Sequence, residues 1–108
     1  MKVKLLLDEC VTRHLKREFP NHKVRTVEEA GYKGLENGHL LKAASGHYDV
    51  LVTVDRNLPY QQNLTGLEIA LLILAGKRNS YLRLNPLLPK ALIALDTIKP
   101  GDVIRIDE

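Results

Sequence analysis

Cysteine is scarce in this sequence, and long apolar runs are missing altogether. The chain of 108 residues has one cysteine, Cys10, which excludes an internal disulfide and is typical of a cytoplasmic protein. Its longest apolar segments, such as IALLILA at 69–75, fall far short of the roughly 20 residues that a membrane-spanning helix needs. Asp8 and Glu9 end the first apolar segment early, so the sequence predicts neither a signal peptide nor contact with a membrane.

The composition is that of a globular chain with a small basic excess. Apolar residues make up 44% and charged residues 27%, which argues against disorder, and the length predicts one domain, residues 1–108. The net charge of +3 and the pI of about 9.1 permit contact with an anionic polymer without requiring it.

One segment concentrates basic residues, KRNSYLR at 77–83. Two interpretations of it stay open. It is either a solvated connector, or a nucleic-acid contact in which Lys77, Arg78 and Arg83 meet phosphates and Tyr81 stacks on a base.

Apolar runs alternate with segments of helical periodicity along the chain. The runs favour strands at 3–7, 23–27, 50–54, 68–74 and 102–106. Val11, Leu15 and Phe19 recur at helical spacing between the first two.

Two further helices are predicted from their capping signals. A helix at 37–45 has Asn37 as its expected N-cap, and Gly46 stands where a glycine often follows a helix. Another helix, at 85–98, has Asn85 as its expected cap and Pro86 in the first helical position.

Continuous apolar strands that alternate with helices predict an α/β protein of three layers, α/β/α, with a mostly parallel central sheet. Ligands of such sheets bind at the carboxyl ends of the strands. Asp8 directly follows the first predicted strand and Asp55 directly follows the third. If these strands are parallel neighbours, their ends lie about 5 Å apart, and the two carboxylates repel each other unless a divalent cation joins them. Asp49 begins its strand and is therefore excluded from this site.

Each acid also has a purely structural interpretation. Asp8 is suited to cap a helix that begins at Glu9 or Cys10, and Asp55 is suited to accept backbone hydrogen bonds in a turn. Their equivalent places at two strand ends, with Glu9 alongside, favour a site. Cys10 is interpreted as a packing residue, and the four histidines, without zinc-ligand spacing, as surface residues: His14, His22, His39 and His47.

Two short motifs resemble the PIN-like domains of small prokaryotic proteins. The first is LDEC at 7–10, similar to the family's strand followed by Asp-Glu-Asn, and the second is TVDRNL at 53–58, similar to its T-x-D-x-(D/N)-(F/L) strand end. The segment GLENGHLLKAAS at 34–45 and the final helix and strand are also similar. The resemblance implies a toxin-type ribonuclease that binds Mg²⁺ or Mn²⁺ through clustered carboxylates, often with a cognate antitoxin protein as its partner.

The sequence departs from the family pattern at two positions. The acid that begins the family's middle helix falls on Asn37, with Glu36 one residue earlier as a substitute, and the second acid of the strand-end motif is Asn57. Asparagine can offer a carbonyl oxygen to a metal but brings no charge. The expected metal ligands are therefore Asp8, Glu9, Glu36, Asp55 and Asn57, with Asp8 and Asp55 as the catalytic pair.

The leading hypothesis is metal-dependent cleavage of RNA phosphodiester bonds, with Arg13 orienting phosphate unless it is only a surface arginine. A rival hypothesis is a receiver-like phospho-acceptor domain, which has similar acids but expects Ser or Thr after the fourth strand and Lys after the fifth. Another is a PIN-like binding module that has lost catalysis. The oligomeric state stays open, a homo-oligomer included.

Overall fold

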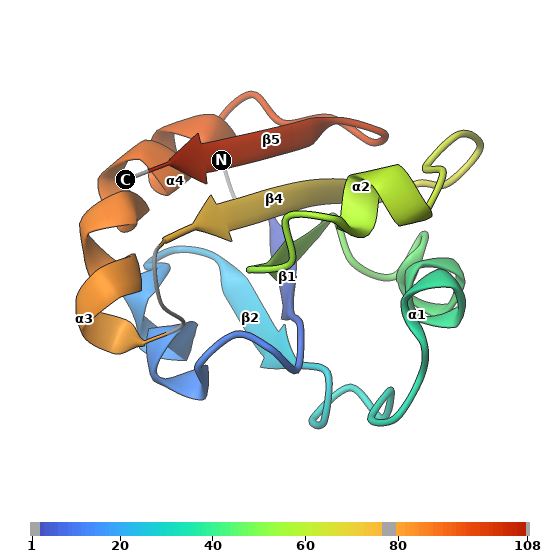
Figure 1. The fold of residues 1–108 in the computed structure, drawn as a ribbon, viewed down its shortest axis with the longest axis horizontal. Helices are drawn as coiled ribbons and strands as arrows, with labels where there is room; N and C mark the ends of the chain where they lie inside the picture. The colour runs from blue at the N-terminus through green and yellow to red at the C-terminus, as the bar shows by residue number, and fades with distance from the viewer. Residues whose placement is uncertain (1–2, 77–79, 108) are drawn as a thin grey trace.

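Five parallel strands form the centre of the protein, and the computed structural model describes residues 3–76 and 80–107. Their order across the sheet is β2-β1-β3-β4-β5 (Figure 1). The strands are β1 Lys4–Leu7, β2 Lys23–Thr26, β3 Val50–Thr53, β4 Ala70–Ala75 and β5 Val103–Asp107. The predicted α/β class with a parallel central sheet is confirmed.

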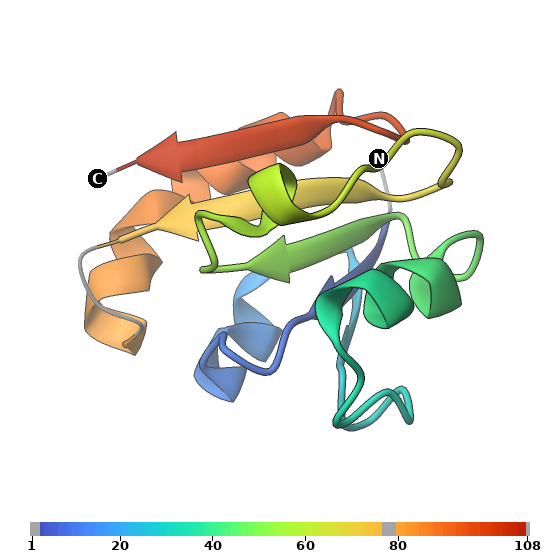
Figure 2. The ribbon, with the colours of Figure 1, turned by 45° about the vertical axis from the view of Figure 1, so that its right-hand side comes forward.

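Helices lie on both faces of this sheet, which is consistent with three layers (Figure 2). The helices are η1 Arg13–Glu18, α1 Asn37–Ala44, α2 Leu58–Gln61, α3 Tyr81–Leu84, η2 Asn85–Leu87 and α4 Leu88–Leu95, where η marks a 3-10 helix. Buried residues of α1 and α2 pack on one face, and those of η1, α3, η2 and α4 pack on the other. No helix in the described ranges is long and apolar enough to cross a membrane.

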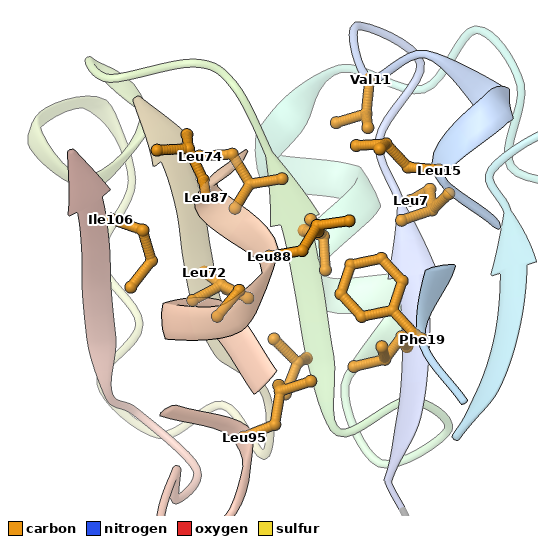
Figure 3. Close-up of a cluster of buried hydrophobic side chains, with 14 of the residues drawn as sticks. Leu7, Val11, Leu15, Phe19, Leu72, Leu74, Leu87, Leu88, Leu95 and Ile106 are labelled. Carbon is orange, nitrogen blue, oxygen red and sulfur yellow. The ribbon is translucent and has the colours of Figure 1, made fainter. Parts of the chain in front are cut away.

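The core explains why the three central strands, β1, β3 and β4, are almost continuously apolar. Leu5 and Leu7 of β1 point into the cluster that η1 and α4 cover, whereas Leu6 between them points into the cluster beneath α1. Figure 3 shows the first cluster, in which Phe19, Leu88 and Leu95 fill the space over the strands. Because both faces are covered, both sets of alternating side chains must be apolar.

The helix boundaries differ from the predicted ones. Glu36, in extended conformation, is the N-cap of α1, and Asn37 is its first helical residue. The predicted helix at 85–98 begins earlier, at Tyr81, and passes through a 3-10 turn at Asn85–Leu87, so Asn85 is the C-cap of α3 and not the N-cap of a helix. Proline has no N–H to donate, and a short turn between two helical pieces accommodates that loss.

The chain changes direction across the sheet at β1. It passes from β1 to β2 on one side and returns to β3 on the other, so β1 and β3 are neighbours although β2 separates them in sequence. A crevice outside the carboxyl ends of the strands at such a reversal is where open α/β sheets bind ligands. The fold therefore directs attention to the residues that follow β1 and β3.

Candidate functional site

The carboxyl ends of β1 and β3 bring Asp8 beside Thr53. Leu7 pairs with Val52, and the ladder continues one step further, with the amide of Asp8 donating to the carbonyl of Val52 at 2.9 Å. Both side chains are buried, with Asp8 8% exposed and Thr53 fully enclosed. A carboxylate in such a place requires hydrogen-bond partners, because burial of an unpaired charge is very costly.

The hydroxyl of Thr53 links the two predicted catalytic acids. It donates to Oδ2 of Asp8 at 2.9 Å and accepts from the backbone amide of Asp55 at 3.1 Å. One side chain therefore fixes the carboxylate of Asp8 and the backbone that carries Asp55. Sequence reasoning gave Thr53 no role, although extending the β1–β3 register by one residue from Leu7 and Val52 identifies it.

Asp8 has further partners nearby. Its Oδ1 accepts from the amide of Glu9 at 2.8 Å, and the thiol of Cys10 donates to its Oδ2 at 3.4 Å. A turn, and no helix, follows Asp8, so it is not the N-cap of a helix that begins at Glu9 or Cys10. The carboxylate is anchored at both oxygens.

Cys10 remains a thiol at neutral pH. Burial raises its pKa, and the neighbouring Asp8 acts in the same direction, while a hydrogen bond with Thr53 opposes them. A reactive cysteine needs the opposite, a lowered pKa. Cys10 packs against the core cluster that η1 covers, which agrees with its interpretation as a packing residue.

Asp55 makes the turn contact that its structural interpretation requires. Its Oδ1 accepts from the amide of Asn57 at 2.9 Å, just before α2 begins at Leu58. Its Oδ2 accepts no hydrogen bond from the described residues, and the side chain is partly exposed. Asp55 thus holds a turn with one oxygen and keeps the other available.

The remaining predicted ligands are engaged elsewhere or exposed. Oε1 of Glu9 accepts from the amide of Gly34 at 2.7 Å. Glu36 and Asn57 are exposed, and neither side chain makes a capping hydrogen bond with its helix. Within residues 3–76 and 80–107, no three side chains among His, Cys, Asp and Glu are placed to hold a metal ion together. The structure links Asp8 and Asp55 through Thr53 but does not assemble the five-ligand shell.

A smaller donor set is still compatible with magnesium. Mg²⁺ is commonly bound through one or two carboxylates, with water and substrate phosphate completing its octahedral shell. Asp8 and Asp55, whose Oδ2 accepts no hydrogen bond from the described residues, follow the neighbouring strands β1 and β3. Figure 2 shows α1 running against the direction of β3, so the N-terminal end of the helix faces the carboxyl edge of the sheet.

A hollow of about 330 Å³ lies beside Asp8, toward β2. Acidic and basic side chains both line it, among them Asp8, Glu9, Arg13, Glu28 and Lys33. The predicted phosphate-contacting Arg13 is therefore in the same hollow as Asp8. Lys33 was not singled out from the sequence, because nothing in its local pattern places it near the first strand.

The basic segment at 77–83 lies partly outside the described residues, including Lys77 and Arg78. Arg83 is exposed on α3. The hydroxyl of Tyr81 donates to Oε1 of Glu18 at 2.8 Å, and this hydrogen bond raises the pKa of Tyr81. Tyr81 is thus tied to η1 through its hydroxyl.

Comparison of the chain with protein-family models, with curated proteins and with solved structures gave no match.

Proposed function

We propose that this protein is a divalent-metal-dependent ribonuclease of the toxin type, with Asp8 and Asp55 as its catalytic pair. The observation that carries the proposal is the link from Asp8 through the Thr53 hydroxyl to Asp55 at the reversal point of the sheet. The resemblance of residues 7–10 and 53–58 to PIN-like domains supports it from the sequence. A cognate antitoxin partner belongs to the same proposal, and a small open reading frame beside the gene would support it.

The chain's own residues position the reacting phosphate. Thr53 holds the carboxylate of Asp8 in one orientation, so this ligand needs no rearrangement when a cation binds. Asp55 offers its second oxygen from the adjacent strand end. If Asp8 and Asp55 hold Mg²⁺ or Mn²⁺, the ion would neutralise charge at the phosphate and would lower the pKa of a water molecule toward neutral pH. Arg13 lines the hollow next to Asp8, where it can orient a phosphate oxygen.

The receiver-like alternative has the same acids and a strand order that doubly wound domains of that kind share. Its other residues are missing from their places. β4 ends at Ala75, where the receiver pattern expects Ser or Thr, and β5 ends at Asp107, where it expects Lys. Lys99 precedes β5. The residues at these two strand ends therefore favour the ribonuclease hypothesis over the receiver hypothesis.

The decisive test is cleavage of single-stranded RNA by the full chain with Mn²⁺. We expect slow cleavage that a chelator stops and that Asp55→Asn abolishes, while Asp49→Asn at the opposite edge retains it. Intact RNA in every condition would contradict the proposal. Intact RNA together with beryllofluoride bound at Asp55 would establish the receiver, and binding of RNA without cleavage would establish the catalytically inactive module.

A further inference from the structure

The hollow beside Asp8 contains two cations that come from different parts of the chain. Arg13 begins η1, and Lys33 lies in the segment between β2 and α1. Both are exposed, and neither forms an ion pair with any residue in the described ranges. Nearby Lys16 differs from them, because Glu29 pairs with it at 2.6 Å.

We infer that Arg13 and Lys33 together hold a phosphate of the RNA strand beside Asp8, and that Glu9 positions Lys33. The inference rests on the proposed function for the identity of the polymer. It adds the residues that bind the strand, and it gives Glu9 a role other than metal ligand.

The segment that carries Lys33 is locally ordered. It begins with a single helical turn in which Thr26 and Glu29 cap each other, each backbone amide donating to the other residue's side chain at 2.9 and 3.1 Å. Gly31 and Gly34, on either side of Lys33, have φ of +83° and +85°, a conformation that other residues adopt at a cost. The backbone path past Lys33 is thus built by specific residues.

Glu9 ties this segment to the end of β1. Its Oε1 accepts the amide of Gly34 at 2.7 Å, one residue beyond Lys33. A charged acceptor makes this a strong hydrogen bond, and it joins residues that lie 25 positions apart. The carboxylate of Glu9 therefore keeps Lys33 at the hollow that Asp8 and Arg13 also line.

The net charge of the hollow makes RNA binding depend on whether a metal ion is bound. Asp8, Glu9 and Glu28 outnumber Arg13 and Lys33, so the metal-free lining carries a net negative charge. A divalent cation at Asp8 reverses that sign. We therefore expect Mn²⁺ to tighten RNA binding, and Arg13 and Lys33 to contribute both with and without the ion.

The test is binding of a fluorescent single-stranded RNA of roughly 8 nucleotides to the full chain in chelator, over a range of salt concentrations. We expect Arg13→Gln and Lys33→Gln each to weaken binding about fivefold near 0.1 M salt, because losing one phosphate contact lowers the salt slope by about 0.7. Lys42→Gln, an exposed lysine of α1 outside the hollow, is the matched control and should bind like wild type. Equal affinity and salt slope in all four proteins would overturn the inference.

Two variants of Glu9 separate positioning from metal binding. Glu9→Gln keeps an oxygen that can accept from the Gly34 amide and removes one negative charge from the hollow, so RNA should bind at least as tightly as to wild type, with Mn²⁺ affinity lowered much less than tenfold. Glu9→Ala removes the same charge and also the acceptor, so it should bind RNA more weakly than Glu9→Gln, by about the factor expected for Lys33→Gln, with the same Mn²⁺ affinity as Glu9→Gln. If Glu9→Gln lowers Mn²⁺ affinity tenfold or so while RNA binding in chelator is unchanged, Glu9 is a metal ligand and the inference fails.

This experiment separates the inference from the proposed function. Loss of binding in the Arg13 and Lys33 variants, with no cleavage in Mn²⁺, would support the binding residues and reject the nuclease. Cleavage by wild type, with unchanged binding in both variants, would support the nuclease and reject these residues. If duplex RNA binds as tightly as the single strand, the hollow recognises a different polymer form and the inference is wrong.

Discussion

Both edges of the sheet carry an aspartate next to β1 and β3, yet the two acids have different surroundings. At the amino edge, Asp49 is exposed and its Oδ2 accepts one hydrogen bond, from the backbone amide of Lys4 at 2.8 Å. At the carboxyl edge, Asp8 is buried and shares the hydroxyl of Thr53 with the backbone of Asp55. Asp49 joins two strands, whereas Asp8 has a buried side-chain partner, a second acid nearby and an adjoining hollow.

Sequence position alone does not make an aspartate a candidate site. Both Asp8 and Asp49 flank apolar strands, and both receive backbone hydrogen bonds. What distinguishes Asp8 is burial, which costs free energy that its hydrogen bonds to Thr53 and Cys10 partly offset. The predictions below test whether the two edges differ as this contrast requires.

Thr53→Val should have the largest effect on stability. Valine removes the hydroxyl, which leaves Oδ2 of Asp8 with only the weak thiol donor and the Asp55 amide without its acceptor. We expect a loss of about 2–3 kcal/mol in the free energy of unfolding, measured by urea denaturation, because buried polar groups lose their partner. Thr53→Ser keeps the hydroxyl and should cost only about 1 kcal/mol for the missing methyl group. Equal losses of unfolding free energy in Thr53→Val and Thr53→Ser would show that the Thr53 hydroxyl does not contribute to stability.

Asp49→Ala should have a smaller effect. It removes one exposed acceptor from the amide of Lys4, which water can then satisfy. We expect a loss of about 1 kcal/mol in the same urea experiment, typical of a single net hydrogen bond. A loss as large as that of Thr53→Val would mean that the amino edge is as tightly constrained as the carboxyl edge, and the contrast between them would fail.

The sequence predicted the strands and the two acids because each depends on local pattern. Continuous apolar runs indicated the covered strands, and Asp8 and Asp55 were found from their place after two of them. The sequence does not state which strands are neighbours, so the contact of Thr53 with Asp8 became visible only when β1 was found beside β3, although Thr53 begins the quoted strand-end motif. The Glu9 to Gly34 hydrogen bond spans 25 positions and has no local signal. The last helical segment was predicted to start at Asn85 rather than at Tyr81, because Pro86 resembles the first residue of a helix.

Asn57→Asp should sharpen the proposal for metal binding. The backbone amide of Asn57 donates to Oδ1 of Asp55, so a carboxylate at residue 57 would add a negative charge two residues beyond Asp55. Opposite charges about 4 Å apart interact by about 4 kcal/mol at an effective dielectric of 20, and even a quarter of that tightens binding about fivefold. Mn²⁺ titration by calorimetry measures the change. Unchanged affinity would place Asn57 outside the site.

His22 predicts a pH dependence at the amino edge. Its Nδ1 accepts from the amide of Val3 at 3.1 Å, and burial lowers its pKa below the usual 6.5. The unfolded chain therefore binds the proton of His22 more readily than the folded chain does. The stabilisation that neutral His22 contributes is fully present above about pH 6.5, and it is lost as pH falls through the pKa that His22 has in the folded protein.

Thermal midpoints near pH 7.5 and pH 5.5 test this expectation. The drop on acidification should be smaller in His22→Gln than in wild type, because the glutamine has no proton to gain. His47→Gln, at an exposed histidine, is the control and should follow wild type. Identical drops in all three proteins would show that His22 does not contribute to the pH dependence.

The central claim is that the carboxyl edge, and not the amino edge, binds a divalent cation. Its most direct test is the thermal midpoint of wild type, Asp55→Asn and Asp49→Asn with Mn²⁺ and with chelator. A ligand bound only by the folded state raises stability by about 2.7 kcal/mol at 100 times its Kd. Mn²⁺ should therefore raise the midpoint of wild type and Asp49→Asn and leave Asp55→Asn unchanged. A wild-type midpoint that does not respond to Mn²⁺, or an equal response in Asp55→Asn, would contradict it.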